Sequence, residues 1–151
     1  MIKEIPNPFP EGVCFFCGKD NKDGLHLRFF QNDETREVYA DYLPEIRFAG
    51  QGTILHGGIQ AGIMDEIMGW TGFAETHSLA VTTKLEIKYH SPVYISEKPV
   101  RISCKITNDE GKKMQLEAAI TDSDGTLCTS ATGSFYKVSP EKYNSLVRKS
   151  R

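Results

Sequence analysis

The residues best suited to chemistry lie in one stretch, "TILHGGIQAGIMDEIMGW" (53–70). It contains an HGG tripeptide at 56–58 and, further on, the adjacent carboxylates Asp65 and Glu66. The stretch is otherwise almost entirely apolar, and a carboxylate removed from water is costly unless it is paired or hydrogen-bonded. Either the two acids occupy a thin exposed strip, or one of them faces a cleft as a base or nucleophile. Periodicity alone leaves both alternatives open.

The tripeptide at 56–58 has the character of a helix start. The free N–H groups of a first helical turn, together with the positive end of the helix dipole, can polarise a carbonyl or hold an oxyanion. Gly57 and Gly58 would let the carbonyl of a ligand approach the backbone closely. For His56 we favour a structural hydrogen bond to the loop over a role as catalytic base.

A second group of reactive residues is the pair Cys14 and Cys17, which has the spacing of half a zinc knuckle. A structural zinc needs four ligands, whereas Cys104 and Cys128 fall singly inside predicted strands. We therefore interpret the pair as a turn with buried thiols and predict no metal site. The N-terminus has no apolar core of a signal peptide, which predicts reduced thiols and a cytoplasmic protein.

A helix over roughly 56–75 must position the acids. It is apolar nearly all the way round, so we expect it to be wrapped by other elements. Gly62 and Gly69 each cost about 1 kcal/mol against alanine inside a helix. Their presence suggests a close backbone approach to a sheet or to a second copy of the helix.

Strands are predicted on both sides of this helix from alternating polarity and turn signals. The predicted strands are 25–30, 36–42, 79–93, 99–108, 113–122 and 127–138. Residues 1–24 are turn-rich, and 139–151 are predicted to form a short helix with Ser139 as its N-cap. This order predicts an α+β fold in a single domain over 1–151, with one long helix packed against a curved antiparallel sheet.

Charge and hydropathy exclude two classes of partner. The net charge is −2 and no basic run is present, so we expect no nucleic-acid partner, because phosphate binding needs clustered Lys and Arg. No apolar run approaches the ~18 residues of a membrane span, so we expect no membrane partner.

The motifs taken together resemble one family. The segments "CFFCGKDNKDGLHLRF", "AGQGTILHGGIQAGIMDEIMGW", "AVTTKLEIKYHSPV" and "DGTLCTSATGSFYKV" run in the order found in PaaI-like hotdog-fold thioesterases, over about residues 12–138. The resemblance implies a hotdog fold, self-association as a homodimer or tetramer through edge strands, and active sites shared between subunits. It also implies hydrolysis of acyl-CoA, with coenzyme A entering as part of the substrate and no separate cofactor.

The resemblance assigns catalytic roles to five residues. Asp65 matches the family's general base or nucleophile, and the Gly57 amide matches the group that polarises the thioester carbonyl. His56 would orient that turn, Thr82 would assist the carboxylate or the attacking water, and Glu66 would play a supporting part.

Five further residues are expected to contact substrate: Gly58, Gln51, Thr83, Met64 and Met68. Gln51 is the one amide in the loop before the tripeptide, where some relatives carry Asn or Gln. Thr83 competes with Thr82 unless a β-bulge intervenes. The two methionines suggest an adaptable apolar pocket.

The expected substrate is a small- or medium-chain, or aromatic, acyl-CoA. The alternative is a hotdog protein that binds acyl-CoA as a carrier or sensor without hydrolysing it. A hotdog dehydratase is disfavoured because its "HxxPGxP"-like setting is missing.

Overall fold

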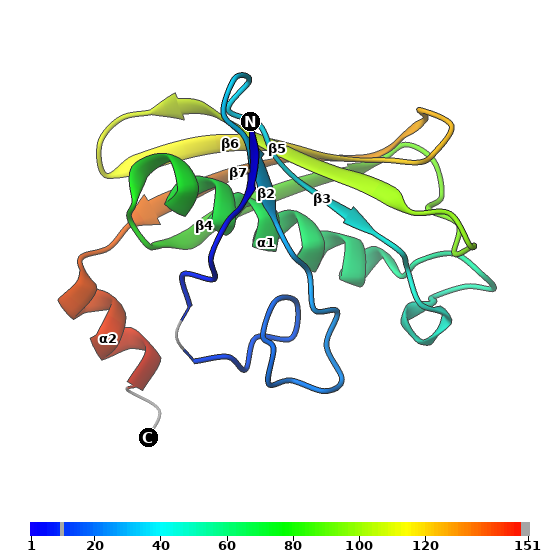
Figure 1. Cartoon of the computed structure of the whole chain (residues 1–151), viewed down its shortest axis with the longest axis horizontal. Coiled ribbons are helices and arrows are strands. Elements are labelled where there is room, and N and C mark those ends of the chain that lie inside the picture. Colours follow the sequence, from blue (N-terminus) through cyan, green and yellow to red (C-terminus); the bar gives the residue numbers. More distant parts are fainter. Residues whose placement is uncertain (10, 149–151) are drawn as a thin grey trace.

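The computed structural model describes residues 1–9 and 11–148. A long helix, α1 (Gly57–Thr76), lies against a curved antiparallel sheet, and residues 11–24 lie on the other side of α1 from the sheet (Figure 1). The strands are β1 (Ile2–Glu4), β2 (Phe30–Asn32), β3 (Val38–Tyr42), β4 (Ala80–Tyr89), β5 (Val100–Asp109), β6 (Lys113–Thr121) and β7 (Leu127–Lys137). A 3-10 turn, η1 (Ile46–Phe48), precedes α1, and α2 (Pro140–Arg148) follows β7. The predicted α+β fold is confirmed.

The strand order in the sheet is β1-β2-β3-β5-β6-β7-β4, and every neighbouring pair is antiparallel. The long strand β4 is therefore an edge strand. It pairs with β7 from Ala80 opposite Lys137 to Tyr89 opposite Thr129. Within the described chain its other side has no partner strand.

The core lies between α1 and the concave face of the sheet. Ile63, Met64, Ile67 and Met68 of α1 have no exposed surface. They face side chains that alternate along the strands, as in β6, where every second residue from Met114 to Ile120 is buried. The inward-facing side chains of the strands, every second residue, thus pack against the apolar surface of α1, as the sequence predicts.

Two sequence-based expectations for the elements are wrong. Residues 25–30 alternate as predicted, with Leu25, Leu27 and Phe29 buried. The strand β2 nevertheless begins only at Phe30, because His26 adopts a left-handed φ of 55° and the 25–27 backbone bonds to the 15–16 backbone. The turn-rich segment 1–24 also contains the short strand β1, which pairs with β2.

Gly62 and Gly69 of α1 face a different neighbour from the one expected. A Cβ at Gly62 would overlap the ring of Phe16, and the nearest group to one at Gly69 is the ring of Phe9. The N-terminal segment, and not the sheet, therefore makes the close approach at Gly62, whereas Gly69 has space for a Cβ.

The C-terminal helix α2 begins as predicted. The Ser139 hydroxyl accepts a hydrogen bond from the Lys142 amide at 3.1 Å, the geometry of an N-cap. The remainder of the predicted helix, 149–151, lies outside the described residues. Among the helices of the described residues, none has both the length and the apolar character to cross a membrane.

Candidate active site

The start of α1 is built by the HGG tripeptide. His56 is the N-cap, and its Nδ1 accepts a hydrogen bond from the Gly58 amide at 2.8 Å. The Gly57 carbonyl accepts a hydrogen bond from the Tyr89 hydroxyl at 2.7 Å, which fixes the first turn to β4. Within the described residues the Gly57 amide donates to no acceptor. His56 thus makes a structural hydrogen bond, to the first helical turn and not to the loop, and a free N–H remains at the positive end of the helix.

A pocket of about 590 Å³ opens at this helix start. Gln51, His56 and Gly57 line it, together with Tyr89 at the end of β4 and the 90–92 segment that follows. Gln51 is exposed in the loop before α1, so the structure places this predicted residue at the pocket. Gly58 lies one residue further along the helix, with its amide engaged by His56.

Asp65 lies in the middle of α1 and faces the edge strand. It is half-buried, and its Oδ1 accepts a hydrogen bond from the Thr82 hydroxyl of β4 at 2.6 Å. The hydroxyl holds the carboxylate in place while leaving its second oxygen without a hydrogen bond from the described residues. The structure therefore brings together two of the residues predicted to act in catalysis.

A β-bulge in β4 gives Thr82 and Thr83 different hydrogen-bond partners. The pairing of β4 with β7 shifts register between Thr82 and Lys84. Thr82 consequently faces α1, although simple alternation would place it on the opposite side. The Thr83 hydroxyl donates instead to the Ser134 carbonyl of β7 at 3.0 Å, away from Asp65.

Glu66 faces in a different direction from Asp65. Its carboxylate lies beside Cys14, whose Sγ is 3.2 Å from Oε2. Burial is the main cause that raises the pKa of Glu66 to about 8, and the neighbouring Cys14 adds to the increase. A hydrogen bond from Cys17 lowers the pKa of the Cys14 thiol. The structure thus separates Glu66 from the site around Asp65.

Met64 and Met68 lie in the core without exposed surface. The Met68 side chain packs against Gly133 of β7, where a Cβ would leave it no room. Their assignment to a substrate pocket stays a prediction.

Sequence reasoning did not single out Gln60, which anchors the helix start. The side chain is buried; its Nε2 donates to the Leu55 carbonyl at 2.9 Å, and its Oε1 accepts from the Thr129 hydroxyl of β7. The Gln60 amide on an otherwise apolar helix face could have indicated this role in the sequence, because a buried amide needs hydrogen-bond partners. Gln60 also lines the pocket at the helix start.

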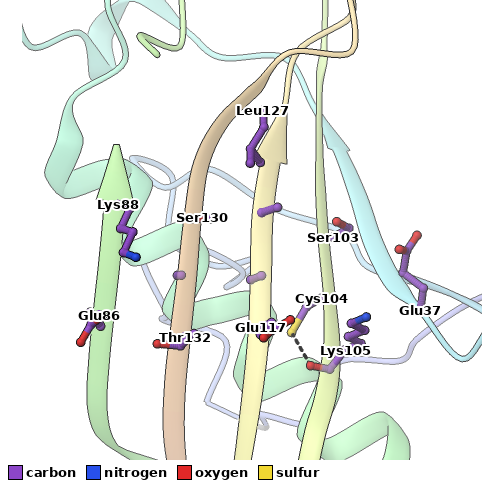
Figure 2. A pocket seen from close by; sticks show the side chains of 13 residues that line it. Glu37, Glu86, Lys88, Ser103, Cys104, Lys105, Glu117, Leu127, Ser130 and Thr132 are labelled. Carbon is purple, nitrogen blue, oxygen red and sulfur yellow. Dashed lines mark hydrogen bonds between the residues drawn. The ribbon is translucent and has the colours of Figure 1, made fainter. Parts of the chain in front are cut away.

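The sheet carries a separate hollow of about 370 Å³. Figure 2 shows it on the face of the sheet that carries the exposed side chains of Glu86, Lys88, Lys105 and Glu117. The residues predicted for the active site do not line this hollow.

One subunit cannot bring Gly57 and Asp65 to the same substrate atom. The two residues are eight positions apart on one helix, which corresponds to about 12 Å along its axis. A group that polarises a carbonyl and a group that activates its attacker must both lie within about 3 Å of the reacting atoms. A site that uses both residues therefore needs a second copy of α1.

Comparison with protein families gives a match to a family model and to curated relatives. The family model described as Thioesterase superfamily matches residues 52–129, which include α1 and β4. The chain is 28% identical over 120 residues to Acyl-coenzyme A thioesterase THEM4 of Rattus norvegicus. The match covers 79% of this chain and 51% of the relative, so the chain spans about half the length of the curated relatives it matches.

Solved structures share the fold. A thioesterase superfamily protein superposes with a TM-score of 0.73 at 22% identity, covering 81% of this chain and 62% of that one. A Streptococcus mutans protein bound to acetyl CoA gives 0.64 at 17%, covering 68% and 81%. The E. coli PaaI protein gives 0.64 at 10%, covering 69% and 74%. At these identities the likeness shows the fold, and it confirms the hotdog arrangement that the sequence predicts.

Proposed function

The chain belongs to the thioesterase superfamily, whose model matches just over half of its residues, and from this premise we propose that it hydrolyses acyl-CoA thioesters to a free acid and coenzyme A. The observation that carries the proposal is the half-buried Asp65 in the middle of an apolar helix, held by the Thr82 hydroxyl. A positioned carboxylate of this kind can act as a general base or as a nucleophile.

Asp65 can promote cleavage of the thioester by two routes. As a base it takes a proton from water while the water oxygen attacks; as a nucleophile it attacks the carbon itself, and water then hydrolyses the resulting anhydride. In both routes the bond from carbon to sulfur breaks and the sulfur leaves as the thiolate of coenzyme A, which takes up the proton that the water has given up. The Gly57 amide would stabilise the negative charge that develops on the carbonyl oxygen, the task of an oxyanion hole.

The site is completed by a second subunit that pairs with the free edge of β4. We consider an antiparallel pairing that sets Thr82 opposite Tyr89 of the partner subunit. Asp65 then lies near this pair, because it is hydrogen-bonded to Thr82. The Gly57 that is hydrogen-bonded to this Tyr89 lies on the other side of the pair, since the contact between Tyr89 and Gly57 occurs in each copy. The carboxylate of one subunit and the free amide of the other would then face the same space. A symmetric pairing of this kind makes two equivalent sites in one dimer.

The proposed substrate is a small- or medium-chain, or aromatic, acyl-CoA. The name of the rat relative and the acetyl CoA bound to the S. mutans neighbour support an acyl-CoA as the ligand. The pocket of about 590 Å³ at the helix start is the candidate place for part of this ligand.

A thiol-release assay over acyl-CoAs from acetyl to long-chain, with phenylacetyl and benzoyl, tests the proposal. We expect the wild type to hydrolyse at least one of them and Asp65→Asn to lose about 100-fold or more in kcat. Asp124→Asn, an exposed acid in the turn after β6, serves as the matched control and should keep wild-type activity.

Two outcomes would contradict this proposal. If neither protein hydrolyses any thioester but both bind acyl-CoA, the chain is a carrier or sensor. If Asp65→Asn is as active as the wild type, another group performs the chemistry.

A further inference from the structure

We propose that Cys14, Cys17 and Glu66 form a binding site for a divalent cation of the Zn²⁺ class. Their two Sγ atoms and one carboxylate oxygen all lie within 4.8 Å of one another. Two thiolates on one tetrahedral zinc lie about 3.8 Å apart, since each Zn–S bond is about 2.3 Å long. A small closure of the three side chains would therefore complete the ligand geometry. This site is independent of the proposed hydrolysis.

The two cysteines are held on a rigid turn. The Phe16 amide donates to the Cys14 Sγ at 3.4 Å, and the Gly18 amide donates to the Cys14 carbonyl at 2.8 Å. A Cβ at Gly18 would lie 2.5 Å from the Cys14 nitrogen, so the turn can close only over glycine. Two cysteines separated by two residues, with a backbone N–H aimed at sulfur, form half of a zinc knuckle. An N–H donor of this kind also favours the thiolate, which is the form that binds metal.

The third ligand comes from α1, which the sequence alone does not reveal. Gly62 lies one turn before Glu66 on the same helix face, and the ring of Phe16 packs directly onto it. This contact seats the cysteine turn on the helix, so that Cys14 meets the Glu66 carboxylate at 3.2 Å and 3.6 Å from its two oxygens. The sequence interpretation excluded a metal because Cys104 and Cys128 lie elsewhere; the fold supplies an acid in their place.

The charge of this cluster is not balanced by the protein. Glu66 is half-buried, and among the described residues none of the ion pairs includes it. Its carboxyl oxygens are bonded by the Cys14 thiol, at 3.6 Å and 3.2 Å, and by no basic side chain of the described residues. A bound divalent cation would be the largest local charge and would neutralise the carboxylate together with the thiolates.

The cluster is also accessible. A pocket of about 400 Å³ borders Cys14, Cys17 and Glu66, with Phe9, Glu11, Val13, Tyr143 and Val147 among its other lining residues. The pocket gives the cation a path of entry and leaves room for water as a fourth ligand, the arrangement of a three-ligand zinc site. The bound cation would hold the N-terminal segment onto α1.

Equilibrium dialysis of the full chain, reduced and stripped of metal, measures this site directly. We expect one Zn²⁺ per chain, and Co²⁺ should give the ultraviolet charge-transfer band of metal-bound thiolates. Zn²⁺ at a hundredfold excess over its Kd should raise the Tm by about 5–10 °C. Cys14→Ser, Cys17→Ser and Glu66→Gln should each weaken binding at least tenfold, whereas the control Cys128→Ala should not.

Thiol alkylation of the wild type followed by mass spectrometry gives a readout that needs no variant. Bound Zn²⁺ should protect Cys14 and Cys17 from alkylation and leave Cys104 and Cys128 unaffected. Failure of the reduced wild type to bind Zn²⁺ stoichiometrically would overturn the proposal. Equal binding by Glu66→Gln and the wild type would overturn the assignment of the third ligand.

Discussion

Asp65 and Glu66 are neighbours in sequence, yet their side chains leave the helix about 100° apart and meet different surroundings. Asp65 meets a hydroxyl on an edge strand, whereas Glu66 meets two thiols on the N-terminal turn. The sequence could narrow the chemistry to this pair but could not assign each acid a partner. That assignment depends on which elements pack on each side of α1.

The bond between Thr82 and Asp65 leads to a prediction at the same scale. Thr82→Val removes the hydroxyl that fixes the carboxylate, and hydrogen bonds to charged groups contribute about 1.5–3 kcal/mol. We expect kcat for the best acyl-CoA to fall about 10- to 100-fold with little change in KM, and Thr82→Ser to restore it.

Thr83→Val is the matched control, because its hydroxyl bonds to Ser134 and not to Asp65. Equal losses of kcat in the Thr82 and Thr83 variants would show that the effect comes from damage to β4 and not from the carboxylate.

Among the elements, the long and strongly patterned ones were predictable. The helix α1 and the strands from β4 to β7 lie within a few residues of their predicted bounds, because each carries its own period and its own turn signals. Residues 25–29 lie within a predicted strand, and Leu25, Leu27 and Phe29 are buried in alternation. Their backbone, however, bonds to the turn around Phe15 and Phe16, a contact that no local pattern encodes.

The bulge in β4 was likewise beyond the sequence pattern. Alternation assigns Thr82 to the side facing away from the core, and one shifted position in the pairing with β7 reverses this. Only the register of the whole strand pair determines where the shift falls.

The packing of the N-terminal segment on α1 predicts opposite effects of two similar substitutions. Gly62→Ala should improve helix propensity by about 1 kcal/mol, but its Cβ would overlap the Phe16 ring, and overpacking costs about 1–3 kcal/mol. We therefore expect a net decrease in the free energy of unfolding.

Gly69→Ala tests the same argument with the opposite sign. The nearest group to its Cβ is the Phe9 ring at 4.0 Å, so the gain in helix propensity should stabilise the protein by up to about 1 kcal/mol. Urea unfolding of both variants measures the two effects; stabilisation by Gly62→Ala would contradict the described packing.

For the whole molecule, two buried side chains that are uncharged at neutral pH make the free energy of unfolding decrease at alkaline pH. Burial raises the pKa of Tyr42 and of Cys104 to about 12, from ordinary values of 10.0 and 9.0. The folded state holds these protons more tightly than the unfolded chain does, so the stabilisation is fully present below about pH 9 and is lost as the pH rises through 12.

We expect the free energy of unfolding, measured with urea, to fall by about a few kcal/mol between pH 9 and pH 12. Cys104→Ala should show a smaller fall than the wild type, although it is less stable at pH 8 because it leaves a cavity in the core. A fall of the same size in both proteins would contradict the role of Cys104.

The central claim at this scale is that each active site uses Asp65 of one subunit and Gly57 of the other. Gly57→Pro removes the free N–H with little disturbance of the helix, because proline suits the first helical position. His56 already has a φ of −55° and a ψ of 133°, an extended conformation that is compatible with a following proline. Gly57→Ala keeps the amide and is the control, since its Cβ would meet Tyr89 at an ordinary 3.5 Å.

The most direct measurement is the kcat of heterodimers purified through two different affinity tags. A Gly57→Pro subunit paired with an Asp65→Asn subunit retains one intact site, so we predict about half of the wild-type activity from two inactive parents. A wild-type subunit paired with the double variant retains none, so we predict an inactive dimer. The reverse result, an inactive first heterodimer and a half-active second one, would show that each subunit works alone and would contradict the account.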